Sequence, residues 1–251
     1  MSCTRQQLNA FFEDLLTPQR FKDYCPNGLQ VEGKTDVRHL VTGVTASQAL
    51  IEAARDREAD AILVHHGYFW RSEPPCITGM KAARLRALIQ ADINLFAYHL
   101  PLDCHPVHGN NAALGRLMGI EAYEALDLED PGSPVFWGQL GESVTVQRFA
   151  DRLGVALDRT PLVIGEGDVK SVAWCTGAGQ GYIDLAADAG VDVYVTGEVS
   201  EQTAHVALER DIAFIGAGHH ATERYGVQAV GSLAAAELGL SHEFIDIDNP
   251  A

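Results

Sequence analysis

The sequence predicts an α/β fold made of two similar lobes with mainly parallel sheets. Short apolar runs rich in β-branched residues alternate with amphipathic stretches of helical period, which is the pattern of strands and helices in such folds. Each half of the chain reads strand, helix, strand, helix, strand. With 251 residues, 47% of them hydrophobic, the chain is long enough to bury one large core or two adjoining ones.

The apolar runs are the predicted strands, and the amphipathic stretches are the predicted helices. The strands occupy residues 39–45, 61–66, 93–99, 171–176, 192–197, 213–219 and 242–247. The helices occupy residues 4–16, 46–57, 79–91, 109–118, 180–189, 200–210 and 222–238. Most strands are nearly continuous in apolar residues, as expected for a parallel sheet that helices cover on both faces.

The two halves align with one another in sequence. Residues 45–66 match residues 177–198 at an offset of 177 − 45 = 132, and this alignment places Asp60 over Asp192. A duplication would produce this similarity, and so would the general likeness of βαβ units, so both explanations stay open.

The repeat predicts where the lobes begin and end. We expect a first lobe over residues 1–123, a connector or insert over residues 124–168, and a second lobe over residues 169–251. The connector begins with a stretch rich in glycine, proline and acidic residues, LEDPGSPVFWGQLGE, which is typical of a segment between domains. We expect the second lobe to pack on the first.

Charge and cysteine content narrow the possible partners and location. The formal net charge of −16 argues against binding to duplex nucleic acid and favours attraction of cations. The five cysteines are scattered and include no Cys-x-x-Cys pair, which indicates a reducing cytoplasm rather than a disulfide framework. The sequence shows neither a secretory leader nor an apolar run of about twenty residues, so we expect a soluble cytoplasmic protein without a membrane span.

A set of histidines and carboxylates indicates a metal site. His65 and His66 end the apolar run AILVHH, and because successive side chains of a strand alternate between faces, we expect each to serve one of two neighbouring ions. Parallel sheets place ligand sites at the carboxyl ends of strands, where His99 and His219 also fall. Imidazole with carboxylate suits Zn, Fe, Mn or Ni. The site is therefore predicted to be shared between the lobes, with residues of the first lobe and then of the second: His65, His66, His99, Asp103, His219 and Glu223.

The neighbouring sequence predicts the local structure around His219, Glu223 and Asp103. His219 and Glu223 are four residues apart, which puts them on one face if a helix has begun there. Pro101 predicts that the segment carrying Asp103 is a loop. A histidine pair at a strand end could instead cap the sheet by hydrogen bonding, without any metal.

A glycine-rich turn offers a different hypothesis. Gly177, Gly179 and Gly181 follow a predicted strand and precede a predicted helix, with Glu198 further on, which is close to a dinucleotide-binding fingerprint. The third glycine comes one residue early, so a tight strand-to-helix connection is the favoured interpretation. The Pro-Asn-Gly turn within residues 25–33 is expected to be a surface turn without chemistry.

Several motifs, occurring in order, resemble a known family. They are NGLQVEG, GVTAS, ADAILVHHGYFW, HLPLDCHPVHGNN, TGEVSEQTAH and AGHHATERYGV. Together they resemble the Nif-three-like dinuclear metal-centre family, also labelled GTP cyclohydrolase type 2 homologs, and in particular its bacterial YbgI-like branch. The resemblance runs from about residue 24 to the C-terminus. Many members have an aspartate where this chain has Thr45, so Thr45 is not counted as a ligand.

The resemblance implies an assembly and a ligand arrangement. Six two-domain subunits would form a ring, a homohexamer whose cavity faces the metal sites. His65 would bind one ion together with His219, and His66 would bind the other together with Asp103. Glu223 would bridge the two ions. His99 falls where the family keeps a histidine close to the metals.

These features together predict a metal-dependent hydrolase. Two divalent ions of Zn, Fe, Mn, Ni or Mg would activate a bridging hydroxide, His99 would move protons, and Glu198 would support a ligand. The family label suggests a small nucleotide or a related purine or pterin compound as substrate. Two alternatives remain, namely a non-catalytic protein that stores or delivers metal or acts as a scaffold, and a dinucleotide-dependent oxidoreductase that uses the glycine turn.

Overall fold

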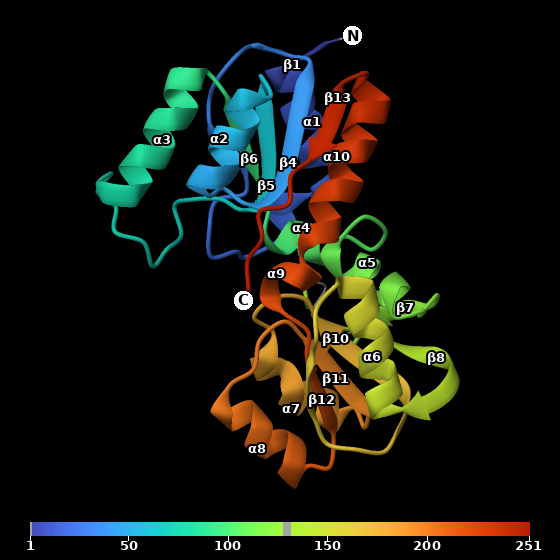
Figure 1. Cartoon of the computed structure of the whole chain (residues 1–251). Coiled ribbons are helices and arrows are strands. Elements are labelled where there is room, and N and C mark those ends of the chain that lie inside the picture. The colour runs from blue at the N-terminus through green and yellow to red at the C-terminus, as the bar shows by residue number, and fades with distance from the viewer. Residues whose placement is uncertain (1, 128–131) are drawn as a thin grey trace. The chain divides into compact units, whose positions relative to one another are not determined.

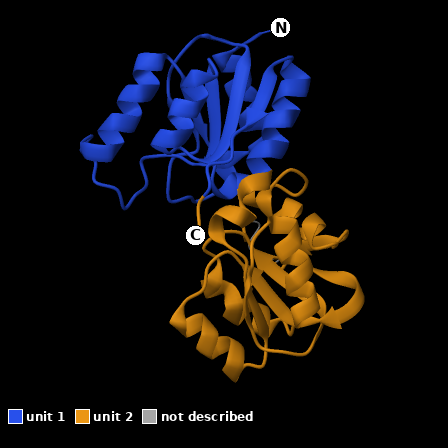
Figure 2. Ribbon diagram, viewed as in Figure 1, with its two compact units in different colours: residues 1–102, 226–248 blue, residues 103–225, 249–251 orange. Residues whose placement is uncertain are grey.

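The computed structural model describes residues 2–127 and 132–251 and separates the chain into two compact units (Figure 2). Unit 1 comprises residues 1–102 and 226–248, and unit 2 comprises residues 103–225 and 249–251. This division differs from the expected boundaries at 123 and 168, because the chain returns to the first unit for its last helix and strand. Residues 128–131 of the expected connector lie outside the described residues.

Unit 1 is built on a five-stranded sheet in the order β13-β4-β5-β6-β2 (Figure 1). Strands β13, β4, β5 and β6 are parallel, and β2 is antiparallel to β6 at one edge. Their bounds are β2 (Gly28–Val31), β4 (His39–Thr45), β5 (Ala61–His66), β6 (Asn94–Ala97) and β13 (Ser241–Phe244). A small antiparallel pair, β1 (Cys3–Thr4) with β3 (Asp36–Val37), is separate from this sheet.

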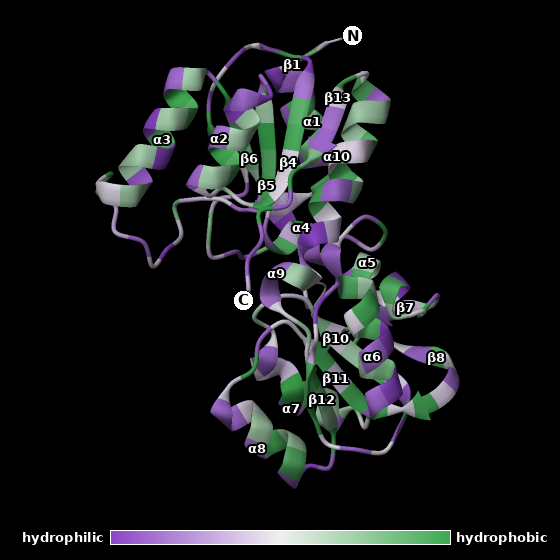
Figure 3. Cartoon of the chain, viewed as in Figure 1, coloured by the Kyte–Doolittle hydropathy of each residue, from purple (hydrophilic) through white to green (hydrophobic). Residues whose placement is uncertain are grey.

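Helices cover both faces of the unit 1 sheet. Along β5, Ile62 and Val64 belong to the core that lies under α2 (Gln48–Asp56) and α3 (Gly79–Ala91). Leu63, on the opposite face, belongs to the core formed with the two remaining helices, α1 (Arg5–Leu16) and α10 (Arg224–Leu238). Because both faces are buried, the strand is apolar from Ala61 to Val64, and only its last two residues are histidines (Figure 3).

Unit 2 has a six-stranded mixed sheet in the order β7-β8-β10-β11-β12-β9. Strands β10, β11 and β12 are parallel, whereas β7, β8 and β9 pair antiparallel with their neighbours. The bounds are β7 (Tyr123–Ala125), β8 (Phe136–Thr145), β9 (Leu162–Ile164), β10 (Asp168–Cys175), β11 (Val193–Thr196) and β12 (Ala213–Gly216). The expectation of mainly parallel sheets therefore holds for unit 1 and not for unit 2.

The antiparallel strands come from the segment expected to be a connector. In the first half of β8, buried and more exposed side chains alternate, which suits an antiparallel strand with one solvated face. The segment also contains α6 (Val146–Leu157), which begins at Thr145, whose hydroxyl accepts a hydrogen bond from the Arg148 N–H. The glycine and proline residues near the start of this segment led us to expect a connector, whereas the segment forms the strand β8, the helix α6 and the strand β9.

Two hydrophobic cores sandwich the unit 2 sheet. One lies beneath α6 and α5 (Asn110–Leu117), and the other lies beneath α7 (Ile183–Asp188) and α8 (Glu201–Glu209). Trp174 on β10 is fully buried, and its indole N–H donates to the Asn111 carbonyl oxygen. The short elements of the chain are α4 (Leu100–Cys104), α9 (His219–Thr222) and two 3-10 turns, η1 (Pro18–Arg20) and η2 (Gln180–Tyr182).

Asp60 and Asp192, which the sequence alignment pairs, occupy equivalent positions in the two units. The Asp60 carboxylate accepts hydrogen bonds from the backbone N–H groups of Arg38 and His39, and Asp192 accepts them from those of Lys170 and Ser171. Each aspartate directly precedes a strand that has a parallel neighbour on both sides, β5 for Asp60 and β11 for Asp192, and hydrogen-bonds to the preceding strand in the sequence. The two units therefore use the same side-chain type at the same place in their sheets.

The helices of the described chain do not include one that is both long and apolar enough to cross a membrane.

Candidate metal centre

His65 and His66 end β5, and their rings are anchored in different directions. The His65 Nδ1 atom lies 3.0 Å from the carbonyl oxygen of Tyr98, just after β6, and the His66 Nδ1 atom lies 3.1 Å from the hydroxyl of Thr45, at the end of β4. The ring centroids are 4.5 Å apart. Because a carbonyl oxygen can only accept, Nδ1 of His65 carries the proton and its Nε2 lone pair is the one that can bind a metal.

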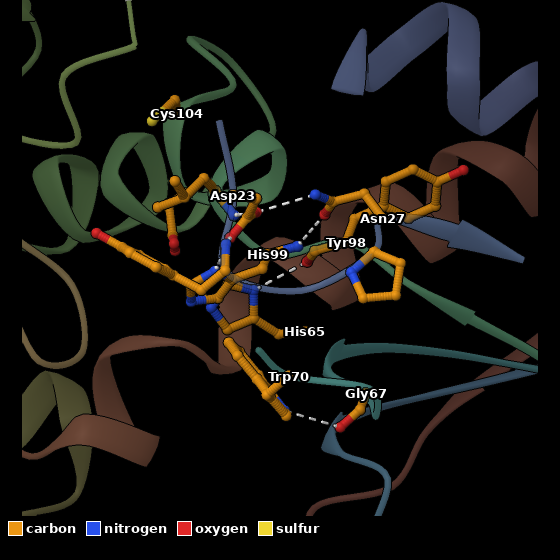
Figure 4. Close-up of polar contacts among 12 residues, drawn as sticks. Asp23, Asn27, His65, Gly67, Trp70, Tyr98, His99 and Cys104 are labelled. Carbon is orange, nitrogen blue, oxygen red and sulfur yellow. Dashed lines mark hydrogen bonds and ion pairs between the residues drawn. The ribbon is translucent and has the colours of Figure 1, made fainter. Parts of the chain in front are cut away.

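His99 follows β6 and is held by a buried aspartate. Its Nδ1 atom lies 2.7 Å from Oδ1 of Asp23, and its backbone N–H donates to the Asn27 side-chain oxygen (Figure 4). Burial acts to raise the pKa of Asp23. The hydrogen bond and charge interaction with His99 and the hydrogen bonds from Asn27 and the Tyr24 N–H outweigh burial and lower that pKa to about 2.

The three histidines of unit 1 form one cluster. The His65 and His99 ring centroids are 5.0 Å apart, and those of His66 and His99 are 5.9 Å apart. One nitrogen from each ring lies within 4.8 Å of the other two. The cluster therefore brings together three residues that the sequence placed at the ends of neighbouring strands, and this spacing suits imidazole ligands of a shared or adjacent ion.

Asp103, in unit 2, is buried and tightly held. Its Oδ1 atom accepts hydrogen bonds from the Asn110 side-chain amide at 2.9 Å and from the Thr176 hydroxyl at 3.0 Å. The segment is the short helix α4 rather than the expected loop. Pro101 fits its first turn, where a missing N–H removes no helical hydrogen bond.

His219 and Glu223 interact across one turn, as the i, i+4 spacing predicts. The Nε2 atom of His219 lies 3.1 Å from Oε2 of Glu223, and its Nδ1 atom lies 2.8 Å from Oε1 of Glu198. Burial acts to lower the pKa of His219, but the two carboxylates prevail and raise it to about 9. The protein without metal thus holds a charged imidazolium between two acids.

The glycine turn packs closely against the carboxylate of Glu223. Gly177 has φ +65°, and a Cβ at this position would collide with the Glu223 carboxylate. The Gly177 N–H donates to the Thr222 hydroxyl, and the Gly179 N–H donates to that of Thr196. Because threonine hydroxyls already accept from these two groups, the N–H groups of Gly177 and Gly179 are not available to a dinucleotide pyrophosphate.

The donor set of the two units fits divalent transition ions. Unit 1 offers imidazoles whose Nδ1 atoms are anchored, and unit 2 offers one imidazole with two buried carboxylates, Asp103 and Glu223. Metal-binding histidines characteristically donate their other ring N–H to a carbonyl or carboxylate, which fixes the ring and its tautomer. Both units therefore show the support that such ligands require.

A sizeable groove of unit 1 lies away from the histidine cluster. A groove of about 840 Å³ in unit 1 runs between α2 and α3 and reaches the residues that precede β4, β5 and β6, where Arg38 and Asp60 line it. The histidine cluster lies at the carboxyl ends of β5 and β6. We assign the site by its ligand chemistry rather than by volume, because the groove supplies one imidazole, that of His39, and no ligand cluster among the described residues.

Sequence reasoning missed the residues that support the ligands. Asp23 is hydrogen-bonded to His99, and Thr176 to Asp103, from distant parts of the chain, whereas Asn110 is hydrogen-bonded to Asp103 from seven residues further along. Asn27 belongs to the Pro-Asn-Gly turn that we expected to carry no chemistry, yet it binds the His99 backbone. The turn was a visible signal, but nothing in it shows which strand end it faces. Glu198 was the supporting residue that the sequence did indicate.

Comparisons with known proteins agree along the whole chain. The family described as Duf34/NIF3 (NGG1p interacting factor 3) matches residues 3–250. A Pseudomonas aeruginosa protein named GTP cyclohydrolase 1 type 2 homolog is 55% identical over 237 residues, 94% of each chain. A Haemophilus influenzae protein of the same name is 53% identical over 248 residues, 98% of each chain. The solved structure of the ybgI protein, described as of unknown function, has a TM-score of 0.94 and 47% identity, and covers 99% of this chain and all of its own.

Proposed function

The chain belongs to the Duf34/NIF3 family, and from this premise we propose that it binds two divalent metal ions and uses them in hydrolysis. The ligands in the proposal are those that the family resemblance implies, two from unit 1 and three from unit 2: His65, His66, Asp103, His219 and Glu223. The observation that carries the proposal is the anchoring of the Nδ1 atom in all three ligand histidines. That anchoring leaves Nε2 as the ligand atom.

Metal binding at His219 requires its imidazole to lose a proton. At neutral pH His219 is charged in the metal-free protein, because its pKa is raised to about 9 by carboxylates against the effect of burial. Binding through Nε2 requires that proton to leave, while Glu198 keeps the proton on Nδ1 in place. Metal uptake should therefore release a proton and become tighter as the pH rises. Zn, Fe, Mn, Ni and Mg all remain candidates, since these ligand types admit several ions.

His99 is proposed as the group that moves protons. Asp23 accepts from its Nδ1 atom, so the opposite nitrogen, Nε2, is available to take or give a proton beside His65 and His66. Bound divalent ions would supply Lewis-acid activation of water near neutral pH. Asn27 accepts from the His99 backbone N–H and so holds the backbone that carries the ring, which therefore needs little reorganisation to act.

The substrate class in this proposal is a small nucleotide or a related purine or pterin compound. It is supported by the name shared by the curated relatives, GTP cyclohydrolase 1 type 2 homolog. The fold itself hosts many chemistries and does not select one. The dinucleotide-dependent alternative loses its main support, because the Gly177 and Gly179 N–H groups donate to threonine hydroxyls.

The deciding experiment compares metal-loaded wild type with Glu223→Ala on a panel of nucleotides, purines and pterins. Release of phosphate or ammonia, or opening of the ring, by wild type and its loss in Glu223→Ala would support the hydrolase. The matched control is Glu201→Ala, because Glu201 is an exposed acid in the same unit. No turnover of any compound with metal binding intact would overturn it in favour of a storage, delivery or scaffold protein.

We also propose that the chain forms a homo-oligomer, a hexamer by the family resemblance. Light scattering after size-exclusion chromatography would show a mass about six times the 27.1 kDa of one chain. A monomeric or dimeric mass at micromolar concentration would contradict the proposal.

A further inference from the structure

A second cavity of unit 1 lies beside His99 and has aromatic walls. It has a volume of about 230 Å³, and six consecutive or nearby residues line it: Asp23, Tyr24, Cys25, Pro26, Phe69 and Arg71. Tyr24 is 56% exposed and Phe69 is 37% exposed, so neither ring is part of the core. Ligand sites combine such aromatic surface with a few polar groups.

Phe69 is held in a strained conformation. Its φ of +66° is in the left-handed region, which a bulky residue rarely adopts because that conformation is strained. Glu73 stabilises it by accepting the Phe69 N–H at 3.0 Å, and Lys81 lies 5.0 Å from the Phe69 ring centroid and 3.0 Å from Glu73. The surrounding loop thus keeps a large aromatic side chain at the surface of a cavity instead of burying it.

The cavity is connected to His99 through direct neighbours. Asp23 lines the cavity and accepts from His99 Nδ1 at 2.7 Å, and the Tyr24 ring centroid lies 6.2 Å from that of His99. On the other side Trp70 packs edge-on against His99, 4.9 Å between centroids (Figure 4). A ring bound between Tyr24 and Phe69 would therefore lie close to the proposed proton-transfer group.

Arg71 supplies the positive charge of the cavity. Its backbone N–H donates to the Tyr24 carbonyl oxygen, while its exposed guanidinium forms neither a hydrogen bond nor an ion pair with any part of the chain that the structure describes. The Asp23 carboxylate already accepts four hydrogen bonds. Burial, followed by the charges of Asp23 and Glu73, raises the pKa of Cys25 to about 12, so its thiol is neutral. Arg71 is thus the cavity's open site for an anion.

We propose that this cavity binds the base of a small nucleotide, with the base against Phe69 and Tyr24 and the phosphate on Arg71. The volume is below the 300–1,000 Å³ typical of sites for larger ligands, so it suits one ring system with the sugar and phosphate outside. Stacking on aromatic side chains and a guanidinium contact to phosphate are common means of nucleotide recognition. The inference rests on the proposed function in taking this cavity as the place where the substrate binds.

The test is a calorimetric titration of the full-length protein, as purified and again after chelation, with three probes. Guanosine 5′-monophosphate carries ring and phosphate, guanosine carries the ring alone, and ribose 5-phosphate carries the phosphate alone. We expect the monophosphate to bind most tightly and to change the fluorescence of Trp70. Arg71→Gln should weaken the monophosphate about ten-fold and leave guanosine unchanged. Arg148→Gln, another exposed arginine, should change neither.

Phe69→Gly separates binding from folding. Glycine adopts the left-handed conformation without strain, so this variant should be at least as stable as wild type and still lose ten-fold or more in affinity for the monophosphate and for guanosine. Tyr24→Ala, at an exposed site, should act in the same direction. Absence of saturable binding by millimolar monophosphate, or affinity unchanged in all three cavity variants, would overturn the inference.

Chelation followed by return of the metal distinguishes this inference from the proposed function. Monophosphate binding that persists after chelation would sustain the cavity without bearing on the hydrolase. Wild-type protein that binds the monophosphate but takes up no divalent ion when metal is added back would sustain the cavity and overturn the metal-dependent hydrolase. Two bound ions and turnover of some substrate, with cavity variants as active as wild type, would overturn the cavity and sustain the hydrolase.

Discussion

The Nδ1 atom of His219 lies 2.8 Å from Oε1 of Glu198, so a carboxylate fixes one side of the imidazole whose other side faces Glu223. The two remaining ligand histidines are fixed by weaker acceptors, a backbone carbonyl and a threonine hydroxyl. The charged acceptor should raise the basicity of His219 most. The first prediction concerns this difference.

Glu198→Ala should lower the affinity for a divalent ion about 10–100-fold, the usual effect of removing such a partner. Glu198→Gln keeps an acceptor without the charge and should lie between Ala and wild type. Isothermal titration with Zn²⁺ or Mn²⁺ measures this, with Glu201→Ala as the control on the same segment. Equal affinities in wild type and Glu198→Ala would show that Glu198 does not support a ligand.

Gly177→Ala should disturb the acidic part of the centre. The new Cβ would collide with the Glu223 carboxylate, and φ +65° is unfavourable for alanine. We expect weaker metal binding and a loss of about 1 kcal/mol or more in the free energy of unfolding. Gly181→Ala is the matched control, since its Cβ would meet no atom within 4 Å. Metal affinity that is the same in both variants would contradict the packing role of Gly177.

Asp23 should stabilise the fold in a pH-dependent way. Its pKa is lowered to about 2 by His99 and hydrogen bonds despite burial, so the ionised form stabilises the folded state by about 2 kcal/mol above pH 4. This contribution should be lost as the pH falls from about 4 towards 2. Urea unfolding of wild type and Asp23→Asn at several pH values measures it, with exposed Asp14→Asn as the control. A stability difference that stays constant down to pH 2.5 would refute this account.

Asp60 and Asp192 should slow amide hydrogen exchange in equivalent strands, each in its own unit. Burial acts to raise the pKa of each, and hydrogen bonds outweigh it, those from Lys34 and the backbone for Asp60 and those from Ser171 and Lys170 for Asp192. Asp60→Asn should speed amide hydrogen exchange at the starts of β4 and β5, and Asp192→Asn at the starts of β10 and β11. Each variant is the control for the other. Faster exchange in the opposite unit, or in neither, would refute the equivalence.

Strands that are buried on both faces were predictable from the sequence. β4 and β5 have the predicted bounds, because apolar runs that contain β-branched residues are a strong local signal. α3 also has its predicted bounds, because it is rich in alanine, leucine, arginine and lysine, which favour a helix. The predicted strand over residues 242–247 is shifted, since β13 ends at Phe244. The registered pairing of β13 with β4 ends at Phe244 and Thr42, and beyond it the Ile245 N–H donates to the Thr42 carbonyl oxygen.

The mixed sheet of unit 2 was not predictable in the same way. The pairing of β8 with β10 and of β9 with β12 joins segments that local pattern cannot connect. The hydrogen-bond partners of the candidate site residues were unpredictable for the same reason. Asp23 contacts His99, and Thr176 contacts Asp103, across long stretches of sequence that only the fold brings together. The sequence indicated candidate ligands of the right chemical types, whereas the residues that orient them required the structure.

The most direct test of the metal centre is crystallography with anomalous scattering on protein soaked in Zn²⁺ or Mn²⁺, combined with elemental analysis of the same preparation. The account predicts two anomalous peaks per subunit, each coordinated by at least one of the proposed histidines and both in contact with Glu223. A single peak, or none after saturation with metal, would contradict it.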